Sequence, residues 1–163
     1  MCYFLSALVI KNGEDCEVFS LPESTDSHED LIAFKGLQDN GRNVFVRIEY
    51  LPGVDFTNLN EYTLVLDEYA RPDWFTEEAE ARVKNRLRAQ VERMLVREDR
   101  HVLASGCYIL IGDIKIDSCL NARIIHAGSA MIEHADYSMI KHANSATIQY
   151  ANSATIQYAC TKY

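Results

Sequence analysis

Five ring-bearing residues recur at intervals of eight near the C-terminus, and three of them are histidines. They are His126, His134, His142, Tyr150 and Tyr158. Histidines placed on neighbouring strands can bind a metal ion or respond to pH. Tyrosine replaces histidine in the last two units without disturbing the pattern, so a packing requirement for a ring explains the position better. The sequence leaves open whether the three histidines bind a metal.

His28 is a second candidate for chemistry, because Glu29 and Asp30 follow it directly. A histidine oriented by a carboxylate can act as a general base. Consecutive helical residues point in different directions, however, so a helix cap and a solvated first turn explain these residues better. The sequence contains no phosphate-binding glycine loop, nucleophile elbow, HExxH motif or paired Cys/His spacing. We therefore expect no catalytic, cofactor-binding or metal-binding residues, and a protein that is not an enzyme.

A run of basic residues in a long predicted helix raises the alternative of nucleic-acid binding. These residues are Arg82, Lys84, Arg86, Arg88, Arg93 and Arg97. Residues 1–100 nevertheless hold 20 acidic and 12 basic side chains, so they carry the whole net charge of −8. Affinity for nucleic acid comes mainly from Lys and Arg. Direct nucleic-acid binding is therefore not expected, and the basic residues are interpreted as a solvated face paired with nearby acids.

The elements that would position these residues fall into two parts. Residues 1–102 are predicted to form an acidic α+β domain, and residues 103–163 a parallel β-helix, or β-solenoid. In the first part we expect a hairpin around Asn12-Gly13, a short helix capped by Ser27, strands at 44–48 and 62–66, and one long helix over about residues 74–97.

The solenoid prediction rests on an eight-residue repeat from residue 119: CLNARIIH, AGSAMIEH, ADYSMIKH, ANSATIQY, ANSATIQY and the partial ACTKY. The sixth position is always Ile and the fourth always small, and residues two apart share a face of a strand. These positions are predicted to form the core: Ile124, Ile132, Ile140, Ile148, Ile156, Ala122, Ala130, Ser138, Ala146 and Ala154. The first two positions suit a tight corner.

Each octad is long enough for one short strand and a turn. We expect two octads per coil, with residues i and i+16 stacked, and three per coil is the alternative. Residues 107–117 are predicted to be one strand that joins the array to a capping N-terminal domain. The sequence stops in mid-unit without a charged or proline-rich terminator, which predicts a homo-oligomer, a dimer, formed through the last coil. The candidate residues for this contact are Tyr150, Tyr158 and Tyr163.

The cysteines and the N-terminal segment indicate the cellular compartment of the protein. Cys2, Cys16, Cys107, Cys119 and Cys160 are odd in number and form no CxxC pair, which predicts reduced thiols. The apolar start of the chain lacks a basic segment and runs into a polar turn. We therefore predict no signal peptide, no membrane span and a cytoplasmic location.

Two segments of the last octads, Ser145-Ala146-Thr147-Ile148 and Ser153-Ala154-Thr155-Ile156, carry a family resemblance. They resemble the octapeptide-repeat proteins of phages, prophages and their bacterial hosts, whose repeat cores are Asn-Ala-Thr-Val or Ser-Ala-Thr-Val. Met131 and Met139 occupy the fifth position in earlier units, which match loosely. The resemblance implies a β-solenoid, a mobile-element origin and the cytoplasm of a bacterial host cell, and it carries over no functional residues.

An acidic domain, a rigid repeat surface and no catalytic set lead to three hypotheses. The first is a non-enzymatic protein-interaction module, encoded by a phage or mobile element, that inhibits a host defence or nucleic-acid-handling protein. The second is a structural or assembly module that self-associates through the solenoid end. The third is a small-molecule or nucleotide sponge with pockets where protomers meet. The sequence does not identify the protein partner.

Overall fold

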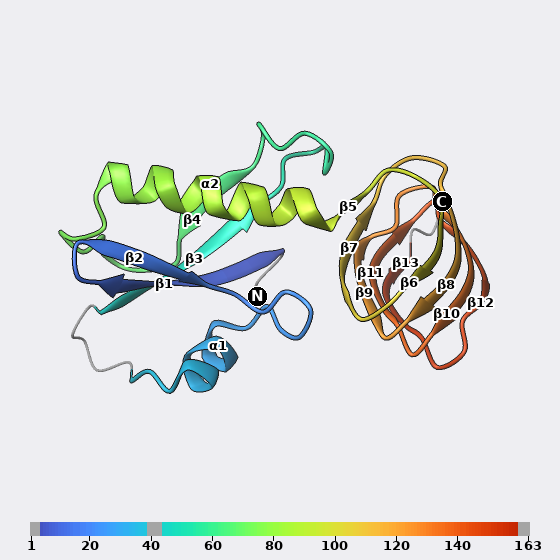
Figure 1. The fold of residues 1–163 in the computed structure, drawn as a ribbon, viewed down its shortest axis with the longest axis horizontal. Helices are drawn as coiled ribbons and strands as arrows, with labels where there is room; N and C mark the ends of the chain where they lie inside the picture. The colour runs from blue at the N-terminus through green and yellow to red at the C-terminus, as the bar shows by residue number, and fades with distance from the viewer. Residues whose placement is uncertain (1–3, 39–43, 160–163) are drawn as a thin grey trace. The chain divides into compact units, whose positions relative to one another are not determined.

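The computed structural model describes residues 4–38 and 44–159 and divides the chain into two compact units, residues 1–92 and 93–163 (Figure 1). The first unit is a four-stranded antiparallel sheet with two helices, and the second is a parallel β-solenoid. The predicted fold class is therefore confirmed. The solenoid strands begin at Leu95, before the first recognisable octad.

The sheet of the first unit has the strand order β2-β1-β3-β4. Its strands are β1 (Leu5–Asn12), β2 (Asp15–Phe19), β3 (Phe45–Leu51) and β4 (Thr63–Leu66). The first two form the predicted hairpin, in which Gly13 has a φ of 63° that suits glycine. The backbone N–H of Asp67 donates to the Arg47 carbonyl over 3.0 Å, which extends the β3–β4 ladder one residue beyond β4.

The two helices start and end at the local signals that sequence reasoning uses. Helix α1 (His28–Lys35) begins after Ser27, whose hydroxyl accepts a hydrogen bond from the Asp30 N–H, and ends at the left-handed Gly36. Helix α2 (Glu77–Met94) is shorter than the predicted 74–97, because Thr76 caps its start and the chain enters β5 at Leu95. Neither of these helices is long and apolar enough to cross a membrane.

Helices α1 and α2 lie on opposite faces of the sheet (Figure 1). The predicted apolar stripe of α2 is buried, with Val83, Leu87 and Val91 fully inaccessible to solvent. On the other face Leu31 of α1 packs with Phe45 of β3. Because side chains alternate along a strand, Arg47 and Glu49 share the α1 face with Phe45.

The solenoid consists of two parallel sheets that the chain visits in turn. One contains β6 (Arg100–Leu103), β8 (Lys115–Leu120), β10 (Met131–Asp136) and β12 (Thr147–Tyr150), and the other contains β5 (Leu95–Val96), β7 (Gly106–Leu110), β9 (Ala122–His126), β11 (Met139–Asn144) and β13 (Thr155–Ala159). Ile132 pairs with Ile148, and Ile140 with Ile156. The sixteen-residue register over about four turns confirms two octads per coil rather than three.

The prediction of a single strand over residues 107–117 is wrong. The segment contains most of β7 and the start of β8, and a corner at Gly112 separates the two strands. The same corner recurs sixteen residues apart, since Gly112, Gly128 and Asn144 all have positive φ values of 77°, 58° and 49°. Such angles favour glycine and asparagine, which explains these residue types at the second octad position of this corner. At the other corner the positive φ falls on the third octad position instead, at Asn121, Tyr137 and Ser153, so the predicted corner positions hold for only one of the two.

Candidate functional site

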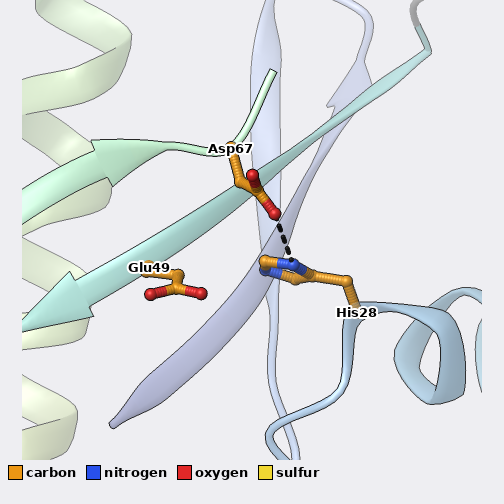
Figure 2. Close-up of side chains that lie close together, drawn as sticks. All are labelled: His28, Glu49 and Asp67. Carbon is orange, nitrogen blue, oxygen red and sulfur yellow. Dashed lines mark ion pairs between the residues drawn. The ribbon is translucent and has the colours of Figure 1, made fainter. Parts of the chain in front are cut away.

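Three side chains from distant parts of the first unit meet on the α1 face of the sheet (Figure 2). His28 is the first residue of α1, Glu49 lies in β3, and Asp67 follows the last residue of β4. One donor atom from each lies within 4.8 Å of the other two. The pairing of β3 with β4 and the capped start of α1 therefore hold all three backbones in place.

The imidazole of His28 is almost completely buried, with 3% of the residue exposed. Its Nε2 lies 3.0 Å from the carbonyl oxygen of Ile48, and its Nδ1 lies 3.3 Å from Oδ2 of Asp67. The carboxylate of Asp67 is 62% exposed, so the cluster opens to solvent on that side. Both ring nitrogens thus face oxygen atoms, and the ring orientation is fixed from two sides.

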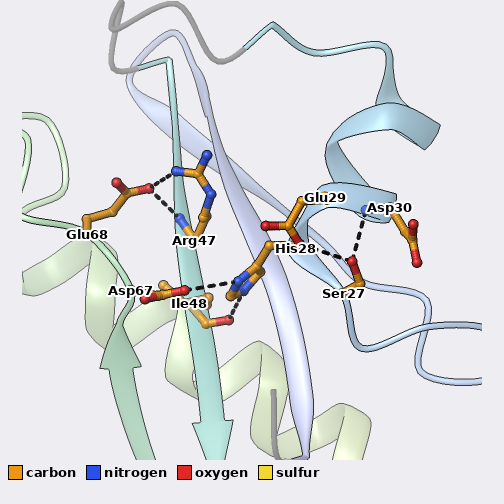
Figure 3. Close-up of polar contacts among 8 residues, drawn as sticks. All are labelled: Ser27, His28, Glu29, Asp30, Arg47, Ile48, Asp67 and Glu68. Carbon is orange, nitrogen blue, oxygen red and sulfur yellow. Dashed lines mark hydrogen bonds and ion pairs between the residues drawn. The ribbon is translucent and has the colours of Figure 1, made fainter. Parts of the chain in front are cut away.

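The acidic residues next to His28 in the sequence are engaged elsewhere (Figure 3). Glu29 accepts a hydrogen bond from the Ser27 hydroxyl at 3.1 Å. Bonds from its own backbone N–H and from this hydroxyl hold the pKa of Glu29 below its ordinary value. The Oδ2 atom of Asp30 accepts a bond from the Thr25 hydroxyl. The carboxylate that forms an ion pair with His28 is therefore Asp67, and Glu29 and Asp30 bond to Ser27 and Thr25.

An ion pair adjoins the cluster (Figure 3). Nη1 of Arg47 lies 2.8 Å from Oε1 of Glu68, and the backbone N–H of Arg47 donates to the same oxygen over 3.1 Å. The contact through Nη1 points one end of the guanidinium at Glu68. The arrangement at His28 offers one nitrogen and two carboxylate oxygens for a cation, or an imidazole and a carboxylate for proton transfer.

Sequence reasoning considered His28 and missed its two partners. Glu49 and Asp67 are the polar members of alternating strand patterns, and such residues are usually solvated. The available signal was Asp67 at the end of a strand, but its proximity to His28 depends on how β3 and β4 pair. That pairing is not encoded in any local pattern.

The predicted repeat core lies inside the solenoid for most of its length. The fully buried members are Ile124, Ile132 and Ile140, and the small residues Ala122, Ala130 and Ser138 are at most 2% exposed. In the last coil Ile148, Ala146 and Ala154 are only partly buried. Ile156 is 40% exposed. The stacked isoleucines therefore become more exposed to solvent toward β12 and β13.

The rings of the eighth octad position form stacks on both sheets. His134 stacks on Tyr150 with centroids 4.9 Å apart, and His142 stacks on Tyr158 at 5.0 Å. His126 is in register with His142 in one sheet, whereas His134 lies in the other. The three histidines therefore do not converge. Tyr150 and Tyr158 are about half exposed, and Tyr163 lies outside the described residues.

The described cysteines Cys16, Cys107 and Cys119 are free thiols, and Cys2 and Cys160 lie outside the described residues. Burial raises the pKa of Cys119 to about 12, which keeps this thiol protonated at neutral pH. The two remaining features are the His28 cluster and the exposed last coil. No family model, curated protein or solved structure matches this chain.

Proposed function

We propose that this chain is a protein-interaction module that forms a homodimer through the last coil of its solenoid. The observation that carries the proposal is the change in burial along one column of stacked residues. Ile124 and Ile140 are fully buried, whereas Ile156, next in the same column, is 40% exposed. An apolar core side chain in this position gains stability when a partner covers it.

The backbone of the last coil also favours pairing with strands of another chain. Strands β12 and β13 are each last in the order of their sheet, so one edge of each has no strand beside it among the described residues. Such edges attract further strands unless charges or proline block them. Residues 143–158 contain no charged residue and no proline. The preceding strands differ, since β8 carries Lys115 and Asp117 and β10 carries Glu133.

A second copy of the chain is the partner that fits this surface best. The last two complete octads are identical, so β12 and β13 present the same residues on the two sheets. A two-fold axis brings one such surface against itself, and symmetric dimers are the commonest protein assemblies. The strands of the two copies then meet in antiparallel fashion, with Tyr150 and Tyr158 at the rim.

Light scattering after size exclusion, at micromolar concentrations, tests the dimer. We expect a mass of about two chains for the native protein, and a single chain of 18.5 kDa for Ile156→Lys. The matched control is Gln157→Lys, which adds the same charge to the outward face of the same strand. The proposal is wrong if the native protein is monomeric, or if both variants behave alike.

The proposal extends to a host partner, because two features support it. The Ser-Ala-Thr-Ile cores resemble octapeptide arrays of phages, prophages and their hosts, and the acidic first unit suits a partner that handles nucleic acid. Inhibition of a host defence protein is the corresponding activity. A pull-down from bacterial lysate with native protein and Ile156→Lys tests this step, and recovery of no stoichiometric partner by either protein contradicts it.

A further inference from the structure

The proposed dimer contact does not involve the cluster of His28, Glu49 and Asp67, whose side chains have the donor atoms of a metal site. We propose that these three residues bind one divalent transition-metal ion, with Nδ1 of His28 and one carboxylate oxygen each from Glu49 and Asp67 as ligands. One potential ligand atom from each of the three residues already lies within 4.8 Å of the other two, and Figure 2 shows the three side chains together.

The contacts of the buried ring determine its tautomer. A backbone carbonyl can only accept a hydrogen bond, so the contact between Ile48 and Nε2 places a proton on Nε2. Nδ1 then faces the Asp67 carboxylate, 3.3 Å away. Two electron-rich atoms at this distance repel each other unless a proton or a cation lies between them. The ring is 3% exposed, so water screens this contact poorly on the histidine side.

The contact of Nε2 with a carbonyl is also the arrangement that orients metal-binding histidines. In such sites one ring nitrogen ligates the ion while the other donates to a backbone carbonyl or a carboxylate, which fixes the tautomer. Here the Ile48 carbonyl fills the second role and leaves Nδ1 facing Asp67, while Glu49 lies nearby.

The distances fit an ion without large rearrangement. Two ligand atoms that each lie about 2.1 Å from a metal are roughly 3.0 Å apart at an octahedral angle and roughly 3.4 Å apart at a tetrahedral angle. The 3.3 Å between Nδ1 of His28 and Oδ2 of Asp67 lies within this interval. Glu49 has a longer and more flexible side chain and needs only a rotamer adjustment to bring one oxygen to the same point.

The donor set and the surrounding charges select the kind of ion. One imidazole with two carboxylates suits Zn²⁺, Fe²⁺, Mn²⁺ or Co²⁺ rather than a thiolate-seeking ion such as Cu⁺. The two carboxylates balance the charge of a divalent ion. Because the Asp67 carboxylate is 62% exposed, water can complete the coordination from the solvent side.

Calorimetric titration with Co²⁺ tests the site. The full-length chain, with any affinity tag removed, is dialysed against a chelator and then against chelator-free buffer. We expect saturable binding of one Co²⁺ per chain, accompanied by a visible absorption band of protein-bound Co²⁺. No saturable binding overturns the proposal.

Isosteric variants locate the ligands. Asp67→Asn and Glu49→Gln each remove one ligand charge at nearly constant volume, and each should weaken Co²⁺ binding at least about tenfold. The matched control is Glu29→Gln, an acid beside His28 that bonds to Ser27 instead, and its affinity should stay within about twofold of the native value. His142→Gln tests whether a histidine of the solenoid binds the ion instead. This variant should bind Co²⁺ with the native affinity. Equal affinity of native protein and Asp67→Asn overturns the proposal.

Circular dichroism of each variant verifies that the fold is intact. Asp67 is exposed and Glu49 half-buried, so both substitutions should leave the spectrum unchanged. A Co²⁺ affinity that falls in a correctly folded variant supports the ligand assignment. An affinity that falls equally in Glu29→Gln contradicts it, because the ion then responds to the general charge of the surface.

Discussion

The two units of this chain bring distant residues together by different means. In the solenoid, residues sixteen apart stack because the chain repeats one coil, so Ile132 meets Ile148 and Ile140 meets Ile156. In the N-terminal unit, His28 and Asp67 meet because an antiparallel sheet and a capped helix place them side by side. The first kind of contact follows from sequence spacing alone, and the second requires the tertiary fold.

This difference determines where specific chemistry can arise. A repeat gives every coil nearly the same environment, so its residues differ mainly by their distance from the end of the array. The His–Tyr stacks illustrate this, since the two stacks have nearly equal centroid distances of 4.9 and 5.0 Å. A cluster of unlike groups such as His28, Glu49 and Asp67 arises where the chain does not repeat.

The largest expected effect contrasts the middle and the end of the solenoid. Ile132→Ala should lower the free energy of unfolding by about 2 to 5 kcal/mol, because it leaves a cavity in a fully buried column. Ile156→Ala removes the same atoms from a side chain that is 40% exposed, and should cost roughly 1 kcal/mol or less. Urea denaturation followed by circular dichroism, at concentrations where the protein is monomeric, measures both. Equal losses would show that position along the array has no influence.

Much of the solenoid could be predicted because its signal is periodic. The inward isoleucines and the two octads per coil follow from the spacing of eight and the alternation of a strand. The earlier coil was missed because its residues no longer match the repeat. In register with Ile116 and Ile124, the preceding coil has Arg100 and Tyr108. The backbone continues the solenoid there, but the isoleucine that identifies it is absent.

The N-terminal unit was predictable only where its signals are local. Ser27 and Gly36 mark the two ends of α1, and Gly13 marks the hairpin, because caps and turns depend on a few neighbouring residues. The partners of His28 were not predictable, since Glu49 and Asp67 are far from it in sequence. Their approach depends on the β3–β4 register, which no local pattern specifies.

A second prediction compares one left-handed glycine from each unit. Gly36→Ala and Gly128→Ala both force alanine into positive φ angles, of 64° and 58°, and should each cost roughly 1 to 2 kcal/mol of stability. Gly128→Ala should cost more, because its new Cβ would lie 3.1 Å from the Leu110 carbonyl, whereas nothing lies within 4 Å at Gly36. Urea denaturation of the two variants measures the difference. A larger loss at Gly36 would mean that the tight stacking of coils adds no steric cost at Gly128.

The smallest expected effect concerns the pH response of the ring stacks. Burial, with a smaller contribution from Lys141, lowers the pKa of His142 in the folded chain. The unfolded chain therefore binds a proton more readily, with a pKa of about 6.5, so the stability that His142 contributes is complete above that pH and is lost as the pH falls below it. Between about pH 7.5 and 5.5 we expect the urea midpoint of the native protein to decrease relative to that of His142→Gln. Both proteins share all other titrating groups, including His126 and His134, so the difference between their pH profiles isolates His142. Parallel profiles would show that the His142–Tyr158 stack leaves the ring as easily protonated as in the unfolded chain.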